Sequence, residues 1–529
     1  MSEQNLRAED TIIDTDRAAP VFWRARVQEF IGARQAQLNL SLDIVAALIW
    51  SLLGFRAITW LDTSWDSLAY HLPFAARLWG IFPKSSYLFY SHLEPLFDGQ
   101  PKLAEFLQGM LWRLTGMVSA ANLVGFSSLL LLTWLTAKRL RVPFWMVTLF
   151  FLSIPLVLIH SVTSMTDLPP NSFIGIAFVN LISTFDDQHF DNRRLFFILL
   201  PLGIAANMKF QALLITAPMW ILVVLIFAYK NWRMFTTDIQ TPRWKIVSRF
   251  LLVALVGGLL LSTSYIANLV RYQNPLYPLA VKIGPLSLKG PGYGVFSEEN
   301  PSATKQIRLD VFKRYVASLS EVPLWRLRSG GPVWTVDMGV AWGAKAKKTA
   351  FFKTGGFFVA NLVLWSVFLL ISAIYARSRK YLPWIAFVAC NFLFVSLLPS
   401  SYLLRYWMFL PVELAILTLW VYRHNPVQLK AIFAMVLILQ AGIFCFVAYK
   451  VRNATFPPPS YTIQNLGRAV VNLDSIIRPY QLAGQTSSLI CIAGGDTRMG
   501  FLYKLSNPQV AIQAAGDDSQ CKSTTIIHP

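Results

Sequence analysis

The stretch FQALLITAPMWILVVLIFAY occupies residues 210–229, and none of its residues carries a charge. A helix needs about 20 mostly apolar residues to cross a bilayer, so this stretch predicts a transmembrane helix. Ten further stretches have the same character, although one of them, 194–208, is short for a complete span. The eleven predicted spans lie near residues 41–60, 118–137, 143–162, 168–185, 194–208, 210–229, 247–267, 353–375, 381–399, 406–422 and 429–449.

The composition of the whole chain agrees with an all-α polytopic membrane protein. Of its 529 residues, 55% are hydrophobic and only 14% are charged, against about a quarter charged in soluble domains. The net charge is +20, but the basic residues cluster at the ends of spans and accompany no nucleic-acid-binding motif. We therefore expect contact with membrane lipids and no nucleic-acid partner.

Short basic loops predict the orientation of the chain. Lys138 to Arg141, Arg193-Arg194 and the Arg-rich N-terminus fall on one side if the spans alternate, and that side is cytoplasmic. Because the number of spans is odd, the C-terminus lies outside. Three parts follow: a cytoplasmic segment 1–40 with an interfacial helix, a transmembrane domain 41–449 with outer loops 61–117 and 268–352, and an extracytoplasmic region 450–529.

The outer regions also carry local patterns. Residues 66–79 and 101–113 have helical periodicity, which predicts two amphipathic helices in the first outer loop. In the tail, strand-like segments at 488–493 and 509–514 flank a short helix and indicate a small α/β cap. Cys491 and Cys521 lie in this cap, so a disulfide between them is a hypothesis if the cap is extracytoplasmic.

Two acidic segments stand at the predicted outer membrane edge. Asp66 and His71 lie in LDTSWDSLAYHLP, residues 61–73, directly after the first span. Asp167 lies in the short loop SMTDLPP, residues 164–170, between the third and fourth spans. Either aspartate alone is as well explained by capping of the helix that follows. Their common position at one edge favours a chemical role.

Three cations on the outer side run against the usual placement of positive charge. They are Lys209, Arg271 and Arg405, each beside an apolar span. Snorkelling to lipid headgroups is one interpretation. Binding of a lipid-linked phosphate is the other, for which the planar fork of arginine is well suited.

Taken in order, these motifs resemble the GT-C superfamily of integral-membrane glycosyltransferases. The likeness is closest to bacterial members of the protein mannosyltransferase, aminoarabinose transferase and RgtA-like group, and it covers roughly residues 40–420. Ser67 stands where that group usually has glutamate, so a metal-binding or acceptor-positioning role of that glutamate does not carry over. The matching segments are Asp66 to His71, Asp167, Asn207 to Phe210, Asn274 to Pro278, and Arg405-Tyr406.

The resemblance implies transfer of a sugar from a polyprenyl-phosphate donor to a lipid, glycan or protein acceptor, with inversion. It implies Asp66 as general base, oriented by His71 or Asp167. We expect no metal or other cofactor and a bacterial inner membrane. Glu94 and Glu105 are secondary candidates, and a solvated position is the favoured interpretation of Glu105. The residues expected to bind substrate or lipid phosphate are Tyr70, Lys209, Arg271, Arg405 and Tyr406.

Three other functions remain open at this stage. A secondary transporter usually places ionisable residues near the middle of its spans, and the spans here are almost free of them. A lipid-linked oligosaccharide ligase or polymerase is favoured by the arginines of the second outer loop, namely Arg308, Arg314, Arg326 and Arg328. A non-catalytic scaffold is the third.

Overall fold

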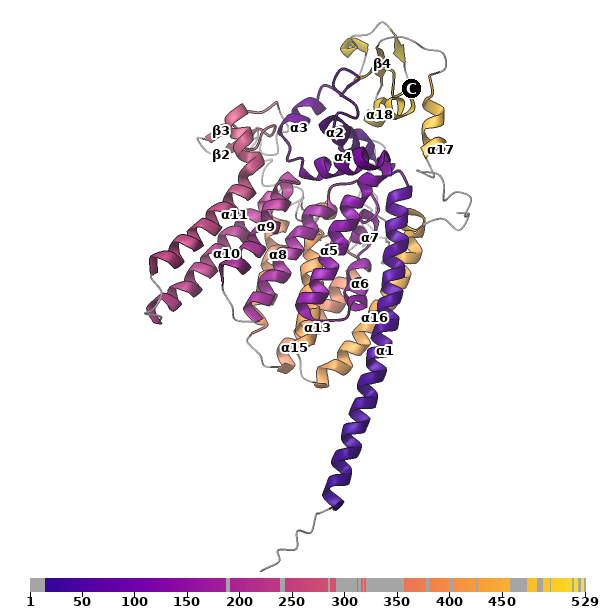
Figure 1. The fold of residues 1–529 in the computed structure, drawn as a ribbon. Helices are drawn as coiled ribbons and strands as arrows, with labels where there is room; N and C mark the ends of the chain where they lie inside the picture. The colour runs from indigo at the N-terminus through magenta and orange to yellow at the C-terminus, as the bar shows by residue number, and fades with distance from the viewer. Residues whose placement is uncertain are drawn as a thin grey trace, which may run out of the picture.

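The structure is a computed structural model, and it shows a long helical bundle with a small α/β unit at one end (Figure 1). It describes residues 15–527 apart from 187–190, 238–242, 284–285, 292–311, 313–314, 317, 320–355, 377–379, 399–400, 402, 425–426, 457–472, 483–488, 495, 516–517 and 522–524. The arginines that favour a ligase or polymerase therefore lie outside the described residues. They are Arg308, Arg314, Arg326 and Arg328.

Apolar helices form the bundle. Within the described part of the chain, seven of them are long and apolar enough to cross a membrane. These seven candidates are contained in α1 (Thr15–Thr59), η2 with α5 (Val118–Asn122 and Leu123–Leu140), α8 (Leu168–Asp186), α10 (Phe210–Thr237), α11 (Arg243–Tyr272), η4 with α15 (Leu404–Trp407 and Phe409–His424) and α16 (Val427–Thr455).

The other four predicted spans correspond to shorter or interrupted helices. Residues 143–162 form α6 (Phe144–Leu152) and α7 (Pro155–His160), because Pro155 has no N–H to continue the first helix. The remaining three are α9 (Asn192–Ala206), α13 (Val359–Ala376) and α14 (Leu382–Ser396).

Side chains from two other helices supply hydrogen-bond partners where the chain is interrupted between α6 and α7. The Asn361 amide donates to the carbonyl oxygen of Ser153 at 2.9 Å, and Gln440 donates to Asn361 at 2.9 Å. All three residues are buried. Backbone groups freed inside a membrane need such internal partners, so α13 and α16 hold the broken helix in place.

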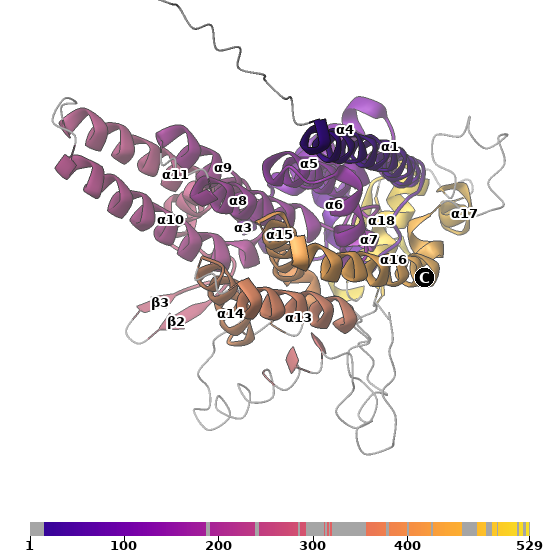
Figure 2. The ribbon, with the colours of Figure 1, turned by 90° about the horizontal axis from the view of Figure 1, so that it is seen from below.

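The N-terminal helix is longer than its predicted span. Helix α1 runs without interruption from Thr15 to Thr59, through the segment in which we expected a separate interfacial helix. Figure 1 shows it extending well beyond the rest of the bundle, and Figure 2, seen from below, shows it beside α5. Its C-terminal end leads into the first outer loop.

The predicted first outer loop, residues 61–117, contains the two predicted helices and more. Its elements are η1 (Ser67–His71), α2 (Leu72–Leu78), β1 (Tyr87–Leu88), α3 (Leu93–Gly99) and α4 (Leu103–Thr115). Helices α2 and α4 approach so closely that a Cβ at Gly109 would lie 2.4 Å from the carbonyl oxygen of Ala75. The second outer loop contributes the antiparallel pair β2 (Val281–Ile283) and β3 (Leu286–Leu288).

The C-terminal α/β unit is built jointly with the first outer loop. The described tail contains α17 (Leu473–Ile477), η6 (Arg478–Tyr480), β4 (Ile490–Ala493), α18 (Thr497–Ser506), β5 (Ile512–Ala515), η7 (Asp518–Gln520) and β6 (Ile526–Ile527). Its parallel sheet has the order β1-β5-β4-β6, with Tyr87 paired to Ile512, so the edge strand comes from the loop. Most of the helix predicted near 463–475 lies outside the described residues.

One apolar core joins the two regions. Phe501 of α18 lies 6.0 Å from Tyr87 and 6.4 Å from Trp112, measured between ring centroids. Leu68, in the turn directly after Asp66, belongs to the same buried cluster. The tail is too short to bury a large core alone, and the loop supplies the missing apolar surface.

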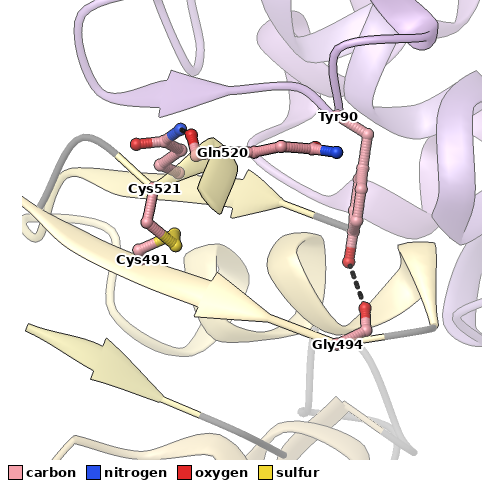
Figure 3. The surroundings of a disulfide bond; sticks show 6 residues. Tyr90, Cys491, Gly494, Gln520 and Cys521 are labelled. Atoms are coloured by element: carbon pink, nitrogen blue, oxygen red, sulfur yellow. Dashed lines mark hydrogen bonds between the residues drawn. A yellow bond between two sulfur atoms is a disulfide. The ribbon is translucent and has the colours of Figure 1, made fainter. Parts of the chain in front are cut away.

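A disulfide and a tyrosine secure the outer end of this unit (Figure 3). Cys491 of β4 is bonded to Cys521, as the sequence suggested. The Tyr90 hydroxyl donates to the carbonyl oxygens of Asp496 at 3.0 Å and Gly494 at 3.4 Å. These bonds fasten the loop to the turn between β4 and α18.

Candidate functional site

Asp66 stands at the start of an unusual helical turn. The chain from Ser67 to His71 forms a π-helical turn, η1, which continues into α2 with Pro73 in the first turn of that helix. Such turns occur frequently at functional sites, because the extra residue changes the direction of the side chains. Only 7% of Asp66 is exposed, so its carboxylate needs a partner.

Asp167 is the residue before α8, and its side chain is fully buried. The amide of Asn171, one turn into that helix, donates to the Asp167 carbonyl oxygen at 2.6 Å. A carboxylate at a helix N-terminus also interacts favourably with the helix dipole. The first turn of α8 therefore fixes the backbone of Asp167, and the dipole of the helix favours its ionised carboxylate.

Arg405 of η4 joins the two acids. Its Nη2 lies 2.7 Å from Oδ2 of Asp66, and its Nε lies 3.9 Å from Oδ2 of Asp167. The Lys209 ammonium forms an ion pair with Asp167 from the other side. Two carboxylates and two cations from four separate segments thus form one cluster, which we call the charge cluster: Asp66, Asp167, Lys209 and Arg405.

Tyr406 covers both cations of the charge cluster. Lys209 Nζ lies 4.8 Å and the Arg405 guanidinium carbon 5.1 Å from the centroid of its ring. Arg405 Nη2 donates to the Tyr406 hydroxyl at 3.3 Å. An aromatic face attracts cations by its negative quadrupole, so Tyr406 helps to hold the two cations together.

The cations lower the pKa of Asp167. Burial by itself raises the pKa of this carboxyl, but the charges of Lys209 and Arg405 outweigh burial and bring it to about 2. Asp167 is therefore ionised at neutral pH and binds a proton weakly.

Tyr70 and His71 lie beside the charge cluster rather than in it. Their rings are 4.2 Å apart. Burial raises the pKa of Tyr70, and the nearby Asp66 carboxylate adds to the rise, so its hydroxyl keeps its proton. His71 Nδ1 lies 2.8 Å from Oε1 of Glu105, on α4.

Glu105 corrects a prediction from the sequence. We expected a solvated carboxylate beside Phe106 on an amphipathic helix, but only 2% of Glu105 is exposed. The side chain faces inward to His71 because α4 packs against α2 on that side.

Arg271 is placed apart from the charge cluster. It lies in the last turn of α11 and is exposed. No ion pair within the described residues links it to Asp66 or Asp167.

Asp62 is a site residue that the sequence did not single out. Its carboxylate accepts from Ser64 N–H at 2.9 Å, from the Ser67 hydroxyl at 2.5 Å and from Ser164 N–H at 3.0 Å. Ser67 follows Asp66, and Ser164 is three residues before Asp167. Asp62 therefore ties together the two segments that carry the acids.

Replacing Asp62 with asparagine is expected to lower the free energy of unfolding by about 2–3 kcal/mol, because hydrogen bonds to a charged acceptor are the strongest of their kind. The amide would also turn a donor toward groups that are themselves donors. Thermal unfolding in detergent measures the effect, with the exposed Asp98→Asn of the same loop as control. Equal unfolding midpoints for the two variants would contradict this role.

A small pocket, with room for about one water molecule, borders the charge cluster. Its lining includes Asp167, Lys209 and Tyr406. Ile174 of α8, Ile215 of α10 and Phe409 of α15 supply apolar walls. Its lining thus combines charged groups with hydrocarbon surface.

Among the described residues, no group of three or more His, Cys, Asp or Glu side chains is arranged to hold a metal ion.

No protein-family model and no curated protein matches the chain. The chain is similar to ArnT from Cupriavidus metallidurans. With the crystal structure of its apo state, this chain shares 13% identity over 92% of its own length and 87% of that chain, at a TM-score of 0.38. With the structure of ArnT bound to undecaprenyl phosphate, identity is 13% over 90% and 86%, at a TM-score of 0.37.

Proposed function

We propose that this protein is a membrane glycosyltransferase that moves a sugar from a polyprenyl-phosphate donor to a lipid, glycan or protein acceptor, with inversion at the anomeric carbon. The charge cluster is the observation that carries the proposal. It brings an acid able to accept a proton within 2.7 Å of a cation able to bind phosphate.

The phosphate of the donor is the leaving group in such a transfer. It departs as a stable anion, so it needs positive charge rather than a proton. Arg405 and Lys209 offer that charge in a buried setting, where electrostatic stabilisation is strongest. The arginine fork can also hold two phosphate oxygens at once. Arg271 lies apart from this cluster, and a role for it would be to attract anionic headgroups at the surface.

Asp66 is the better general base of the two acids. Asp167 binds a proton too weakly near neutral pH, with a pKa of about 2, and it is held by both cations. Asp66 has a single ion-pair partner in the charge cluster, Arg405, whose Nη2 lies 2.7 Å from its Oδ2. An acceptor hydroxyl must lose its proton as it attacks, and Asp66 is the acid of the cluster that is less tightly held by cations.

A polyprenyl phosphate needs an anion site joined to an apolar surface. The charge cluster offers the first, and apolar side chains of α8, α10 and α15 beside it offer the second. The pocket between them has room for only about one water molecule, so it does not hold the polyprenyl chain itself. Tyr406 and Tyr70 line the approach to the charge cluster as aromatic neighbours of the sugar or the phosphate.

We infer the membrane topology from the candidate spans and the basic loops. With the seven long helices and the four shorter or interrupted ones, the chain crosses the membrane eleven times. The N-terminus is then cytoplasmic, and the charge cluster and the C-terminal unit lie on the extracytoplasmic face. In a bacterium this is the outer side of the inner membrane, where a disulfide persists.

The proposal is tested by sugar transfer with the purified full-length protein. Radiolabelled monosaccharides on polyprenyl phosphate are supplied as donors with a bacterial lipid extract, and label in a new product is the expected result. Donors that carry an oligosaccharide on a diphosphate, and solute flux into proteoliposomes, form the comparison arms. Transfer only from the oligosaccharide donors, or flux without transfer, would overturn the proposal in favour of a ligase or a transporter.

A further inference from the structure

A buried histidine–glutamate pair lies behind the charge cluster. His71 Nδ1 and Glu105 Oε1 are 2.8 Å apart, and 2% of each residue is exposed. The Thr166 hydroxyl lies 3.3 Å from both ring nitrogens and is also buried. These three residues come from η1, α4 and the segment before α8.

The carboxylate of Glu105 determines how the imidazole is used. An ionised carboxylate only accepts hydrogen bonds, so Nδ1 of His71 is the donor. With Nδ1 engaged in this short bond, Nε2 is the ring nitrogen left for the Thr166 hydroxyl. A hydrogen bond at one nitrogen fixes both the tautomer and the orientation of the ring.

The ring connects the two segments that carry the acids. His71 ends the π-helical turn that follows Asp66, and Thr166 immediately precedes Asp167. A rotation of the imidazole would therefore change the distance between the two aspartates. The hydrogen bond to Glu105 opposes that rotation. Glu105 is itself held in place, because α4 is packed directly on α2 at Gly109.

We propose that Glu105 is a positioning residue that acts through His71 to hold Asp167 and its cations at a fixed distance from Asp66. This inference rests on the proposed function for its kinetic consequences. Glu105 does not touch the charge cluster itself, so its effect is on the alignment of the reacting groups and not on donor binding.

Two variants of Glu105 distinguish a role in orienting His71 from a role in packing alone. Glu105→Gln keeps an oxygen that can accept from Nδ1, so we expect a partial loss of kcat. Glu105→Ala frees the ring, and misalignment of reacting groups costs about 100-fold in kcat. The KM for the donor should stay within about twofold, because loss of alignment that matters only in the transition state lowers kcat and kcat/KM equally. Glu94→Gln is the matched control, because Glu94 lies in the same loop but pairs with Arg77, 2.8 Å away.

Hydrogen exchange gives a readout that needs no sugar transfer. Glu105→Ala is expected to speed amide exchange in the segment 161–168, and Glu94→Gln is not. If the wild-type protein transfers no sugar but the two variants still differ in exchange in this way, the proposed function is refuted and the structural link is kept. Wild-type kcat and unchanged exchange in Glu105→Ala would overturn the inference. An equal loss of kcat in Glu105→Gln and Glu105→Ala, with unfolding of both, would also overturn it, since that marks a purely structural residue.

Discussion

Replacing Asp66 with asparagine is expected to lower the rate of sugar transfer by about 1,000-fold, within the range typical for loss of a general base. Asparagine has the same shape but cannot take the proton of an acceptor hydroxyl. The fold should persist, because Arg405 keeps Asp167 as a partner. The donor should bind with unchanged or higher affinity, since one negative charge next to the phosphate site is lost.

The measurement is kcat at saturating donor, together with KM for the donor and the thermal unfolding midpoint. Asp98→Asn is the control, because it removes an exposed carboxylate from the same outer loop. A kcat within twofold of wild type in Asp66→Asn would remove this residue as the base. Comparison with Asp167→Asn then shows whether the second acid takes that role.

The bundle could be predicted from the sequence because membrane spans are read from local hydrophobicity alone. The stretch 210–229 became a helix of the expected type, and so did both amphipathic segments of the first outer loop. The interruption before Pro155 was not predicted, because a proline alone does not decide it: Pro201 and Pro218 lie inside uninterrupted helices. The polar partners that satisfy the interruption at Ser153, Asn361 and Gln440, lie 208 and 287 residues away. Local patterns do not reveal such distant compensation.

The shared sheet could not be predicted for the same reason. Strand β1 consists of Tyr87 and Leu88 alone, which is too short for any alternation of side chains to be recognised. Its partner Ile512 is separated from it by most of the chain. The strands of the tail were recognisable by their apolar runs, but the surface that they cover was not.

The charge cluster was foreseeable in its members, and the supporting residues were not. An acid or a cation at a span end is conspicuous, which is how Asp66, Asp167, Lys209 and Arg405 were found. Glu105 was only a secondary candidate, because a carboxylate on an amphipathic helix ordinarily marks the solvated face. Only a partner from another element, here His71, makes its burial acceptable. Asp62 was passed over because its donors Ser64 and Ser164 belong to two different loops.

Arg405→Gln is expected to impair both folding and transfer. It leaves Asp66 without its ion-pair partner in a buried position, and removing one member of a buried pair typically costs about 3–5 kcal/mol. Transfer should fall by about 100- to 1,000-fold, the effect of removing one preorganised donor from a developing anion. Arg423→Gln is the matched control, because Arg423 lies at the opposite end of the same candidate span and donates to the Leu140 carbonyl oxygen.

A double variant distinguishes stability from chemistry at this position. Combining Arg405→Gln with Asp66→Asn removes both charges of the closest pair, so the unfolding midpoint should recover most of what Arg405→Gln alone loses. Activity should not recover, because the base and the phosphate ligand are both absent. Arg405→Lys adds a third comparison: it keeps the charge but loses the planar fork, so folding is retained while kcat remains low. Recovery of transfer in the double variant would show that the pair serves stability alone. Recovery of neither property would show that Arg405 stabilises the fold chiefly through Asp167.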